Sequence, residues 1–154
     1  MNNFNKSPEI INDVQSKVEV KLNFRLVEPK TFIERVGLLP LPLFAFLTPY
    51  SEEDYKEMQT KLFLSEDNES GFGLNPDGHL VSVFSLKRER GVILVREAKE
   101  VGANYLSCMG EKLLELYSSF GFKVIKKEDW KDEHTPKHWD YEKFGRPNVY
   151  EMGL

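Results

Sequence analysis

The chain has 154 residues, a formal net charge of −4, 40% hydrophobic residues and 30% charged residues. This length suggests one domain with a buried core, and the composition is typical of a globular protein. The acidic balance argues against a general nucleic-acid binder, which needs an excess of lysine and arginine. The most apolar run, residues 38–47, contains two prolines and is much shorter than the roughly 20 residues that span a bilayer, so we expect no membrane segment.

The N-terminal residues and the cysteine content favour a reducing cytoplasm as the cellular compartment. The first ten residues lack the basic-then-apolar order of a signal peptide. Cys108 is the only cysteine, so no intrachain disulfide can form and a reducing cytoplasm is expected. We expect a single domain over residues 1–154, with residues 1–17 as an N-terminal extension or short helix. Residues 127–154 should form an irregular C-terminal segment with a last strand.

The first third of the chain predicts a helix, a strand and a proline-rich connection. Ser7 and Pro8 suit the start of a short helix that runs to about residue 17. Polar and apolar residues alternate over residues 18–26, as in a half-buried strand. After a helical turn or two over residues 30–36, residues 37–49 should be extended and packed on the core, because prolines break helices. That piece could form one wall of a substrate cleft or be a buried connection.

The middle of the chain predicts a helix, a short strand and a hairpin. Ser51 should cap the helix, with Asp54 as the reciprocal acid of a capping box. A strand over residues 61–65 follows. The hairpin turns at Gly78, which can take a positive φ. Its second strand, residues 80–86, is apolar on both faces and is therefore expected to be a central strand.

The second half alternates helices and strands up to an irregular stretch after Trp130. Apolar spacing of three and four residues indicates the helices, and glycines mark their ends. We expect helices over residues 92–101 and 110–120 and strands over residues 104–109, 122–126 and 148–152.

A basic loop joins the strand over residues 80–86 to the next helix. In open α/β sheets, ligands bind beyond the carboxyl ends of strands, and the amides at a helix start favour phosphate. Gly91 allows close approach of the backbone, and Lys87, Arg88 and Arg90 add donors for a pyrophosphate or a 3′-phosphate. A solvated charge cluster is the alternative interpretation.

The order of motifs around this loop resembles the GNAT family of acyl-CoA N-acyltransferases. Arg88, two residues and Gly91 open a helix, a strand follows, and the next helix ends in Leu-Tyr-Ser-Ser-Phe-Gly-Phe at residues 116–122. Ile93 departs from the family pattern, which has a second small residue there. The resemblance implies an α/β (α+β) fold with a mixed, mostly antiparallel sheet flanked by helices on both faces.

A second set of motifs is similar to GNAT-like domains encoded by bacteriophages and other mobile elements. The segments are DGHLVSVFSL, GANYLSCM and YEKFGRPNVYEM, and the likeness covers roughly residues 70–152. Ser107 and Asn148 replace two aspartates of that pattern. The resemblance implies a bacterial host cytoplasm as the setting.

The resemblance implies transfer of an acyl group from acetyl-CoA to the amine of a small molecule or protein. Tyr117 would be the general acid that returns a proton to the CoA thiolate, as a phenol within hydrogen-bond reach can do. A core aromatic is the other interpretation of Tyr117. The remaining residues would hold the cofactor, the pantetheine arm through backbone groups and the pyrophosphate through the loop: Phe84, Ser85 and Leu86, then Arg88, Arg90, Gly91 and Val92.

The general base is not identified by the sequence. Four acidic residues are candidates by loop position alone, and an ordered water is an alternative: Glu34, Glu66, Asp67 and Glu69. His134 and His138 invite a zinc interpretation, but Pro136 lies between them and spoils the helical spacing, so no metal is expected. Cys108 lies in a strand and is expected to be an inert buried thiol.

Three functions remain open at this point. The first is an acyl-CoA-dependent N-acyltransferase, favoured by the basic loop and Tyr117. The second is a GNAT-like domain that has lost catalysis and serves as a binding or interaction module, favoured by Ile93 and by the missing base. The third, an RNA- or nucleotide-binding protein, is disfavoured by the net charge.

Overall fold

The computed structural model describes residues 22–154. The helix predicted over residues 7–17 and the beginning of the strand predicted over residues 18–26 lie outside the described residues. Strand β1 (Phe24–Val27) corresponds to the end of that predicted strand. In the described part of the chain, no helix combines the length and the apolar character needed to cross a membrane.

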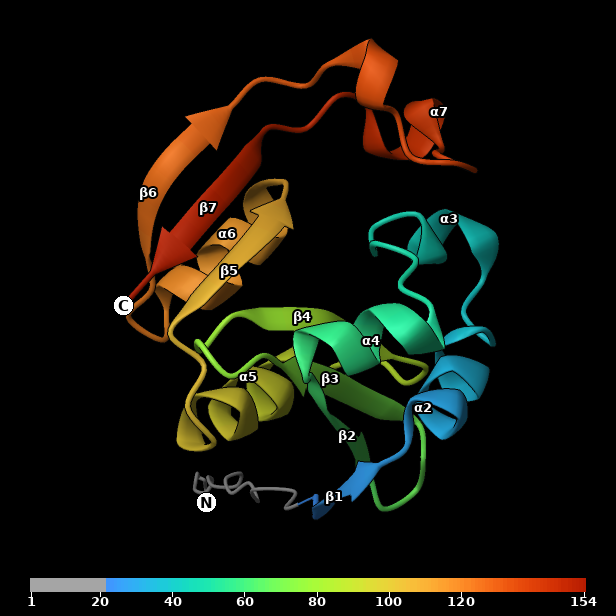
Figure 1. Cartoon of the computed structure of the whole chain (residues 1–154). Coiled ribbons are helices and arrows are strands. Elements are labelled where there is room, and N and C mark those ends of the chain that lie inside the picture. The colour runs from blue at the N-terminus through green and yellow to red at the C-terminus, as the bar shows by residue number, and fades with distance from the viewer. Residues whose placement is uncertain (1–21) are drawn as a thin grey trace, which may run out of the picture.

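A four-stranded antiparallel sheet forms the first half of the molecule, in the order β1-β2-β3-β4 (Figure 1). It contains β2 (Lys61–Ser65), β3 (Ser70–Leu74) and β4 (Leu80–Ser85). The predicted hairpin between β3 and β4 is confirmed, and Gly78 in its turn has a φ of +93°.

Two helices cover one face of this sheet, α2 (Pro29–Val36) and α4 (Glu52–Met58). Their apolar residues meet the sheet around Phe32, which is fully buried and lies 5.3 Å, centroid to centroid, from the ring of Phe84. The capping box is confirmed, because Ser51 Oγ accepts from the Asp54 amide at 3.1 Å and Asp54 accepts from the Ser51 amide at 2.9 Å. It fixes where α4 begins.

The prediction of an extended connection over residues 37–49 is wrong in part. A short helix, α3 (Leu41–Phe44), forms within it. Pro40 is the N-cap residue and Pro42 lies in the first turn, where the amide that proline lacks would have no helical partner. Prolines at these positions start a helix rather than break one.

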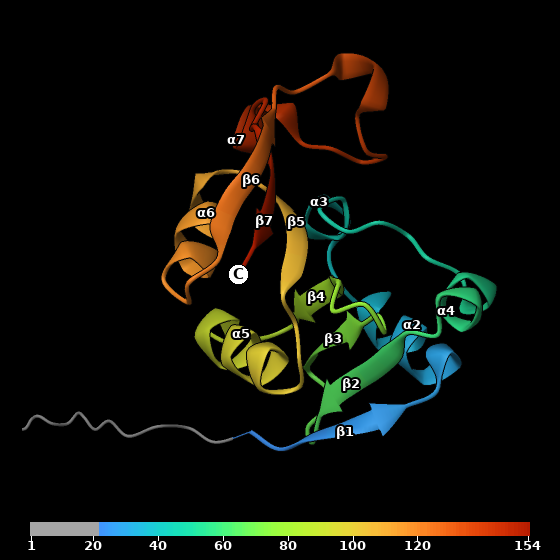
Figure 2. The ribbon, with the colours of Figure 1, turned by 60° about the vertical axis from the view of Figure 1, so that its left-hand side comes forward.

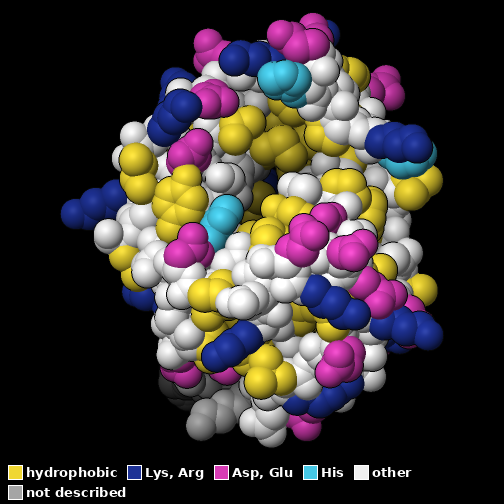
Figure 3. Space-filling view, viewed as in Figure 1, with side chains coloured by type: hydrophobic (Ala, Val, Ile, Leu, Met, Phe, Trp, Pro, Cys, Tyr) yellow, Lys and Arg dark blue, Asp and Glu magenta, His cyan; other side chains and the backbone are white. Residues whose placement is uncertain are grey.

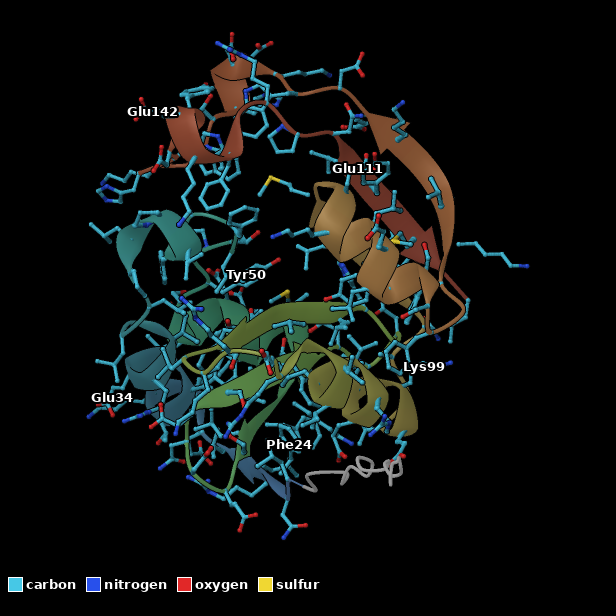
Figure 4. All side chains as sticks on the ribbon, turned by 180° about the vertical axis from the view of Figure 1, so that it is seen from behind. Phe24, Glu34, Tyr50, Lys99, Glu111 and Glu142 are labelled. Atoms are coloured by element: carbon cyan, nitrogen blue, oxygen red, sulfur yellow. The ribbon has the colours of Figure 1, made fainter. Side chains whose placement is uncertain are left out.

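The opposite face carries α5 (Gly91–Glu100), as Figure 2 shows, and α6 (Glu111–Ser118) packs against α5. Both helices pack on one apolar core, whose most buried members include Leu94, Val95, Leu106 and Met152. Lys99 Nζ, labelled in Figure 4, donates to the Phe120 carbonyl oxygen at 2.6 Å. This bond ties the end of α5 to the end of α6.

A three-stranded antiparallel sheet forms the second half, in the order β5-β7-β6. Its strands are β5 (Tyr105–Met109), β6 (Lys123–Glu128) and β7 (Val149–Gly153). The predicted last strand is therefore confirmed, and it lies between the other two. Together, the antiparallel sheets and the helices on both faces confirm the predicted fold class.

The prediction that residues 80–86 form a central strand is wrong. Along its length β4 pairs with β3 alone, and its other edge meets β5 through a single parallel bridge between His79 and Tyr105. The apolar residues on the two faces of β4 pack against helices on both sides of the sheet. An apolar pattern on the two faces of a strand gives no information about which strands pair with its edges. In this protein the sheet divides at the edge of β4 that faces β5.

Residues 129–148, which we call the strap, leave β6 and return to β7. They contain a 3₁₀ turn (Asp132–His134) and α7 (Tyr141–Phe144), and none of them is buried. Figure 1 shows the strap reaching from the second half towards α3 in the first. The Phe46 ring, just after α3, lies 4.9 Å from Trp139 and 4.8 Å from Phe144, so the strap bridges the two halves.

Candidate active site

The two halves of the molecule are joined at one end of β4 and separate along the rest of it. At the joint, the Asn104 amide donates to the Gly78 carbonyl oxygen at 2.9 Å, and His79 forms the bridge to Tyr105. A Cβ at Gly78 would collide with the side chain of Asn104, so glycine is required for this close approach. Beyond the joint, β4 and β5 diverge.

A cavity of about 530 Å³ fills the space between β4 and β5, and we call it the cleft. Its walls include Leu94 and Val95 of α5, Tyr117 of α6, and Phe46 and Tyr50 from the connection between α3 and α4. Because these residues belong to opposite faces of the sheet, the cleft passes through the split. Figure 3 shows a hollow in the middle of the molecule with hydrophobic side chains in its depth. Its volume is in the range typical of small-molecule and cofactor sites.

A bulge in β4 directs backbone groups into the cleft. The register against β3 shifts between Gly71 and Gly73, and Ser82 has a φ of +57°. The Tyr55 hydroxyl of α4 lies 2.7 Å from Ser82 Oγ, and this hydrogen bond connects the bulge to α4. Bulges re-aim strands next to functional sites, and this one aims the strand edge at the split.

The positions of the three residues predicted to bind pantetheine differ. Phe84 and Ser85 line the cleft, whereas Leu86 lies outside its lining. The Leu86 amide donates to the Glu69 carbonyl oxygen at 2.6 Å and is therefore used within the first sheet. Since backbone groups of alternate residues point to opposite edges of a strand, those of Val83 and Ser85 face the split. Val83 was missed because the bulge that sets this alternation has no local sequence signal.

Arg90 is bound within the protein and does not point a free guanidinium at the cleft. Its guanidinium donates to the two oxygens of Asp67 at 3.1 and 2.6 Å and to Ser70 Oγ at 3.0 Å. Asp67 also accepts from Ser65 Oγ at 2.7 Å. Through these bonds Arg90 anchors the loop before α5 to the β2–β3 turn, whereas its predicted contact with pyrophosphate stays a prediction.

The Arg90 guanidinium also holds the pKa of the Asp67 carboxyl well below its ordinary value of 3.8. A carboxyl with a lowered folded-state pKa adds stability above its unfolded pKa and loses it as the pH falls through the folded value. Asp67→Asn should therefore lower Tm by about 3–6 °C at neutral pH, discounted for the partial exposure of the Asp67 side chain.

Thermal melts across pH test this prediction, with Glu66→Gln, at the neighbouring exposed carboxylate, as the control. The difference in Tm between wild type and Asp67→Asn should be full above about pH 5 and narrow progressively below about pH 4. A difference that stays constant down to about pH 2 would contradict the assigned ion pair.

The remaining loop residues present cations and amides at the start of α5. Lys87 lines the cleft, and its amide donates to Ser85 Oγ at 3.1 Å. Arg88 is exposed and, within residues 22–154, forms no hydrogen bond or ion pair with another side chain. Gly91 packs against α6, where an added Cβ would lie 3.0 Å from Leu116 Cδ2, and Val92 is 47% exposed. These residues can hold a phosphate with charge and helix-start amides.

Tyr117 brings a buried hydroxyl to the cleft. The residue is 5% exposed, and its ring packs edge-on against Phe122 at 5.9 Å between centroids. Burial raises the pKa of the Tyr117 phenol, so it keeps its proton. Among residues 22–154 no group forms a hydrogen bond with the hydroxyl. Buried polar groups usually have a partner, so this hydroxyl is available to a ligand or a water in the cleft. Cys108 lies beside it, and burial raises the pKa of that thiol to about 11, which leaves it inert.

None of the four carboxylates predicted as candidate bases lines the cleft. Asp67 is bound to Arg90, and Glu69 Oε2 lies 3.8 Å from Arg35 Nη2. Glu66 accepts from the Asn23 amide at 3.4 Å, and Glu34 lies on the outer side of α2 (Figure 4). In the described part of the chain, no group of three or more His, Cys, Asp or Glu is placed to hold a metal ion.

His79 is a second residue of the cleft that the sequence did not single out. It lines the cleft at the joint of β4 and β5, and its ring contacts that of Tyr105 at 5.0 Å between centroids. The only available signal was its position directly after the turn at Gly78, which is a weak indication.

Comparisons with known proteins support the fold. No protein-family model matches the sequence, and no curated protein matches it. Arabidopsis thaliana NAA60, solved with a bisubstrate analogue, is 12% identical with a TM-score of 0.60 over 87% of this chain and 97% of its own. A Bacillus subtilis acetyltransferase in complex with CoA is 16% identical with a TM-score of 0.54 over 87% of this chain and 98% of its own.

A GNAT superfamily phosphinothricin acetyltransferase from Sinorhizobium meliloti, in complex with acetyl-CoA, gives the same result. It is 12% identical with a TM-score of 0.55, and the match covers 88% of both chains. The protein described here therefore has the fold of the GNAT acetyltransferases, as the sequence resemblance implied.

Proposed function

We propose that the protein transfers an acetyl group from acetyl-CoA to an amine. The observation that carries the proposal is the hydroxyl of Tyr117, buried and without a protein partner in the described chain, at the wall of a cleft that splits the sheet. Two neighbours of the same fold were solved with CoA or acetyl-CoA. The setting would be a reducing bacterial cytoplasm, that of the host if a bacteriophage encodes the chain.

Each part of the cleft has a role in this proposal. The amides of Gly91 and Val92, with Lys87 and Arg88, hold the pyrophosphate at the start of α5. Backbone groups of Val83 and Ser85 bind the pantetheine arm along the edge of β4. Arg90 keeps the loop in place through Asp67.

In this proposal the amine reacts with the thioester of acetyl-CoA. The amine nitrogen attacks the thioester carbonyl carbon, a C–N bond forms and the C–S bond breaks. The Tyr117 hydroxyl gives its proton to the departing thiolate and regains one from solvent. The nitrogen loses its proton to a group at the acceptor side of the cleft or to water.

A turnover assay tests the proposal. Release of the CoA thiol should depend on the presence of both acetyl-CoA and an amine. Bound acetyl-CoA with no release for any amine would instead support the second candidate, a GNAT-fold binding module without catalysis. That candidate is favoured by one observation, that none of the expected carboxylate bases faces the cleft.

Arg88→Ala should weaken acetyl-CoA binding about five- to tenfold and leave Tm unchanged. The reason is that Arg88 is exposed and, within residues 22–154, has no side-chain partner, so its charge is free to meet a phosphate. Titration of acetyl-CoA at low and moderate salt measures the effect, which should shrink as salt screens the pair. Arg96→Ala, at an exposed arginine of α5 outside the cleft lining, is the matched control. Equal affinities for the two variants would remove Arg88 from the site.

A further inference from the structure

The acceptor side of the cleft is uncharged. This side, which we call the acceptor end, is the part of the lining on the face of the sheet that carries α2 and α4. It includes Phe46, Leu47, Thr48, Tyr50, His79 and Met109. In the described chain, the charged residues that line the cleft are Lys87, Glu89 and Arg90, and all three belong to the loop before α5. The charge of the cleft is therefore concentrated at the end assigned to the phosphates.

An uncharged lining excludes acceptors with further charges. A polyamine would bring additional ammonium groups, and a free amino acid would bring a carboxylate. Burying such a charge without an opposite charge costs far more than an apolar wall returns. Aromatic and aliphatic side chains such as Phe46, Leu47 and Met109 instead favour an apolar body, which gains free energy in proportion to the area that it buries.

The strap packs against Phe46, which is part of the wall at this end of the cleft. Trp139 and Phe144 pack against Phe46 from across the split. Inside the strap, Trp139 Nε1 donates to the Gly145 carbonyl oxygen at 2.9 Å, and Asp132 accepts from Trp130 Nε1 at 3.0 Å. These bonds hold the aromatic layer over Phe46, so the acceptor end lies beside a closed bridge. Such a bridge suits a small molecule better than a lysine on the surface of a folded protein.

His79 is the polar group at this end. Its backbone is fixed, because the amide donates to Asp77 Oδ1 at 3.1 Å and the carbonyl oxygen accepts from the Asn75 amide at 3.0 Å. Within residues 22–154, neither ring nitrogen of His79 has a hydrogen-bond partner. Its ring touches Tyr105 of β5, whose hydroxyl donates to Glu151 of β7 at 2.6 Å. Histidine is the side chain that most readily exchanges a proton near neutral pH.

We propose that the acceptor is a small primary amine on an apolar, aromatic body, and that His79 takes the proton its nitrogen loses, directly or through one water. The inference rests on the proposed acetyl transfer. The uncharged acceptor end and the aromatic layer over Phe46 support the class of substrate. The position of the His79 imidazole at the joint of the two halves supports its role as the base.

A series of four acceptor amines tests the proposed class of substrate. Acetyl-CoA binding is measured first by calorimetry, and CoA thiol release is then followed with 2-phenylethylamine, spermidine, glutamate and a lysine-bearing peptide. We expect kcat/KM for 2-phenylethylamine to exceed the others at least tenfold. Preference for any of the three charged acceptors, or no acetylation of the aromatic amine although acetyl-CoA binds, overturns the inference and leaves acetyl-CoA binding standing. If acetyl-CoA does not bind, the proposed function fails and the inference falls with it.

Substitutions at Phe46 and His79 test the roles proposed for these two residues. Phe46→Ala should raise KM for the aromatic amine about tenfold without changing acetyl-CoA affinity, and Phe46→Leu should restore most of it. Leu43→Ala, an exposed residue of α3 outside the lining, should have no effect. His79→Gln should lower kcat at least tenfold near neutral pH, and the deficit should shrink as the pH approaches the pKa of the free amine. Asp77, Tyr105 and Glu151 remain unchanged in that variant, so a deficit that does not vary with pH would show that His79 is only part of the wall.

Discussion

Tyr117→Phe should lower kcat about a hundredfold and leave the affinity for acetyl-CoA unchanged. Among residues 22–154, Tyr117 and the inert thiol of Cys108 are the buried proton donors that line the cleft. Burial raises the pKa of Tyr117, so the proposed activity of the wild-type protein should not fall between about pH 8 and pH 10 through ionisation of this group. Steady-state kinetics and calorimetry measure the two quantities.

Measurements of Tm distinguish a catalytic role of the Tyr117 hydroxyl from a structural one. Tyr117→Phe removes a hydroxyl that has no hydrogen-bond partner among the described residues, so Tm should not fall. Tyr55→Phe is the matched control, because the Tyr55 hydroxyl lies 2.7 Å from Ser82 Oγ and its loss should cost about 1 kcal/mol. Equal turnover in wild type and Tyr117→Phe would remove the catalytic role, and a lowered Tm for Tyr117→Phe would indicate a hidden structural partner.

Gly71→Ala should lower the free energy of unfolding by about 3 kcal/mol and Tm by on the order of 10 °C. Gly71 lies in β3 between Leu64 of β2 and Phe84 of β4. An added Cβ would collide with the backbone carbonyl oxygen of Phe63 and would lie 2.9 Å from Leu64 Cδ2. A backbone atom cannot rotate away, so β2 and β3 would have to separate.

Thermal melts compare this variant with Gly37→Ala. Gly37 follows α2 at a φ of −64°, where alanine is tolerated, and the nearest atom to its added Cβ is the Ile33 carbonyl oxygen at 3.3 Å. That control should change stability by less than about 1 kcal/mol. Because Gly71 faces Phe84 beside the bulge, its variant should also lose acetyl-CoA binding. A fall in Tm no larger than that of the control would contradict the packing described for β3.

The parts of the fold that depend on local signals could be predicted from the sequence. Ser51 and Asp54 form the capping box that their spacing indicated, and Gly78 takes the positive φ that its turn requires. The helix α3 was not predicted, because Pro40 and Pro42 were expected to break a helix. Proline stops a helix in its interior but is compatible with the start of one. The same residue type thus gives opposite results at positions that only the structure distinguishes.

The parts that depend on distant residues could not be predicted. The edge position of β4 is set by which strands pair with it, and its own apolar pattern does not record that choice. Arg90 is held by Asp67, 23 positions earlier in the chain, so its charge looked free in the sequence. Tyr117 was found through the family resemblance, whereas His79 emerged only when the joint of the two halves placed it in the cleft.

Calorimetric titration of acetyl-CoA into the purified protein shows whether the cleft is an acetyl-CoA site. We expect one saturable site per chain with a micromolar Kd, a matching rise in Tm as acetyl-CoA is added, and weaker binding for Arg88→Ala than for Arg96→Ala. No heat of binding and no change in Tm at millimolar acetyl-CoA would contradict the assignment of the cleft between β4 and β5 as an acetyl-CoA site.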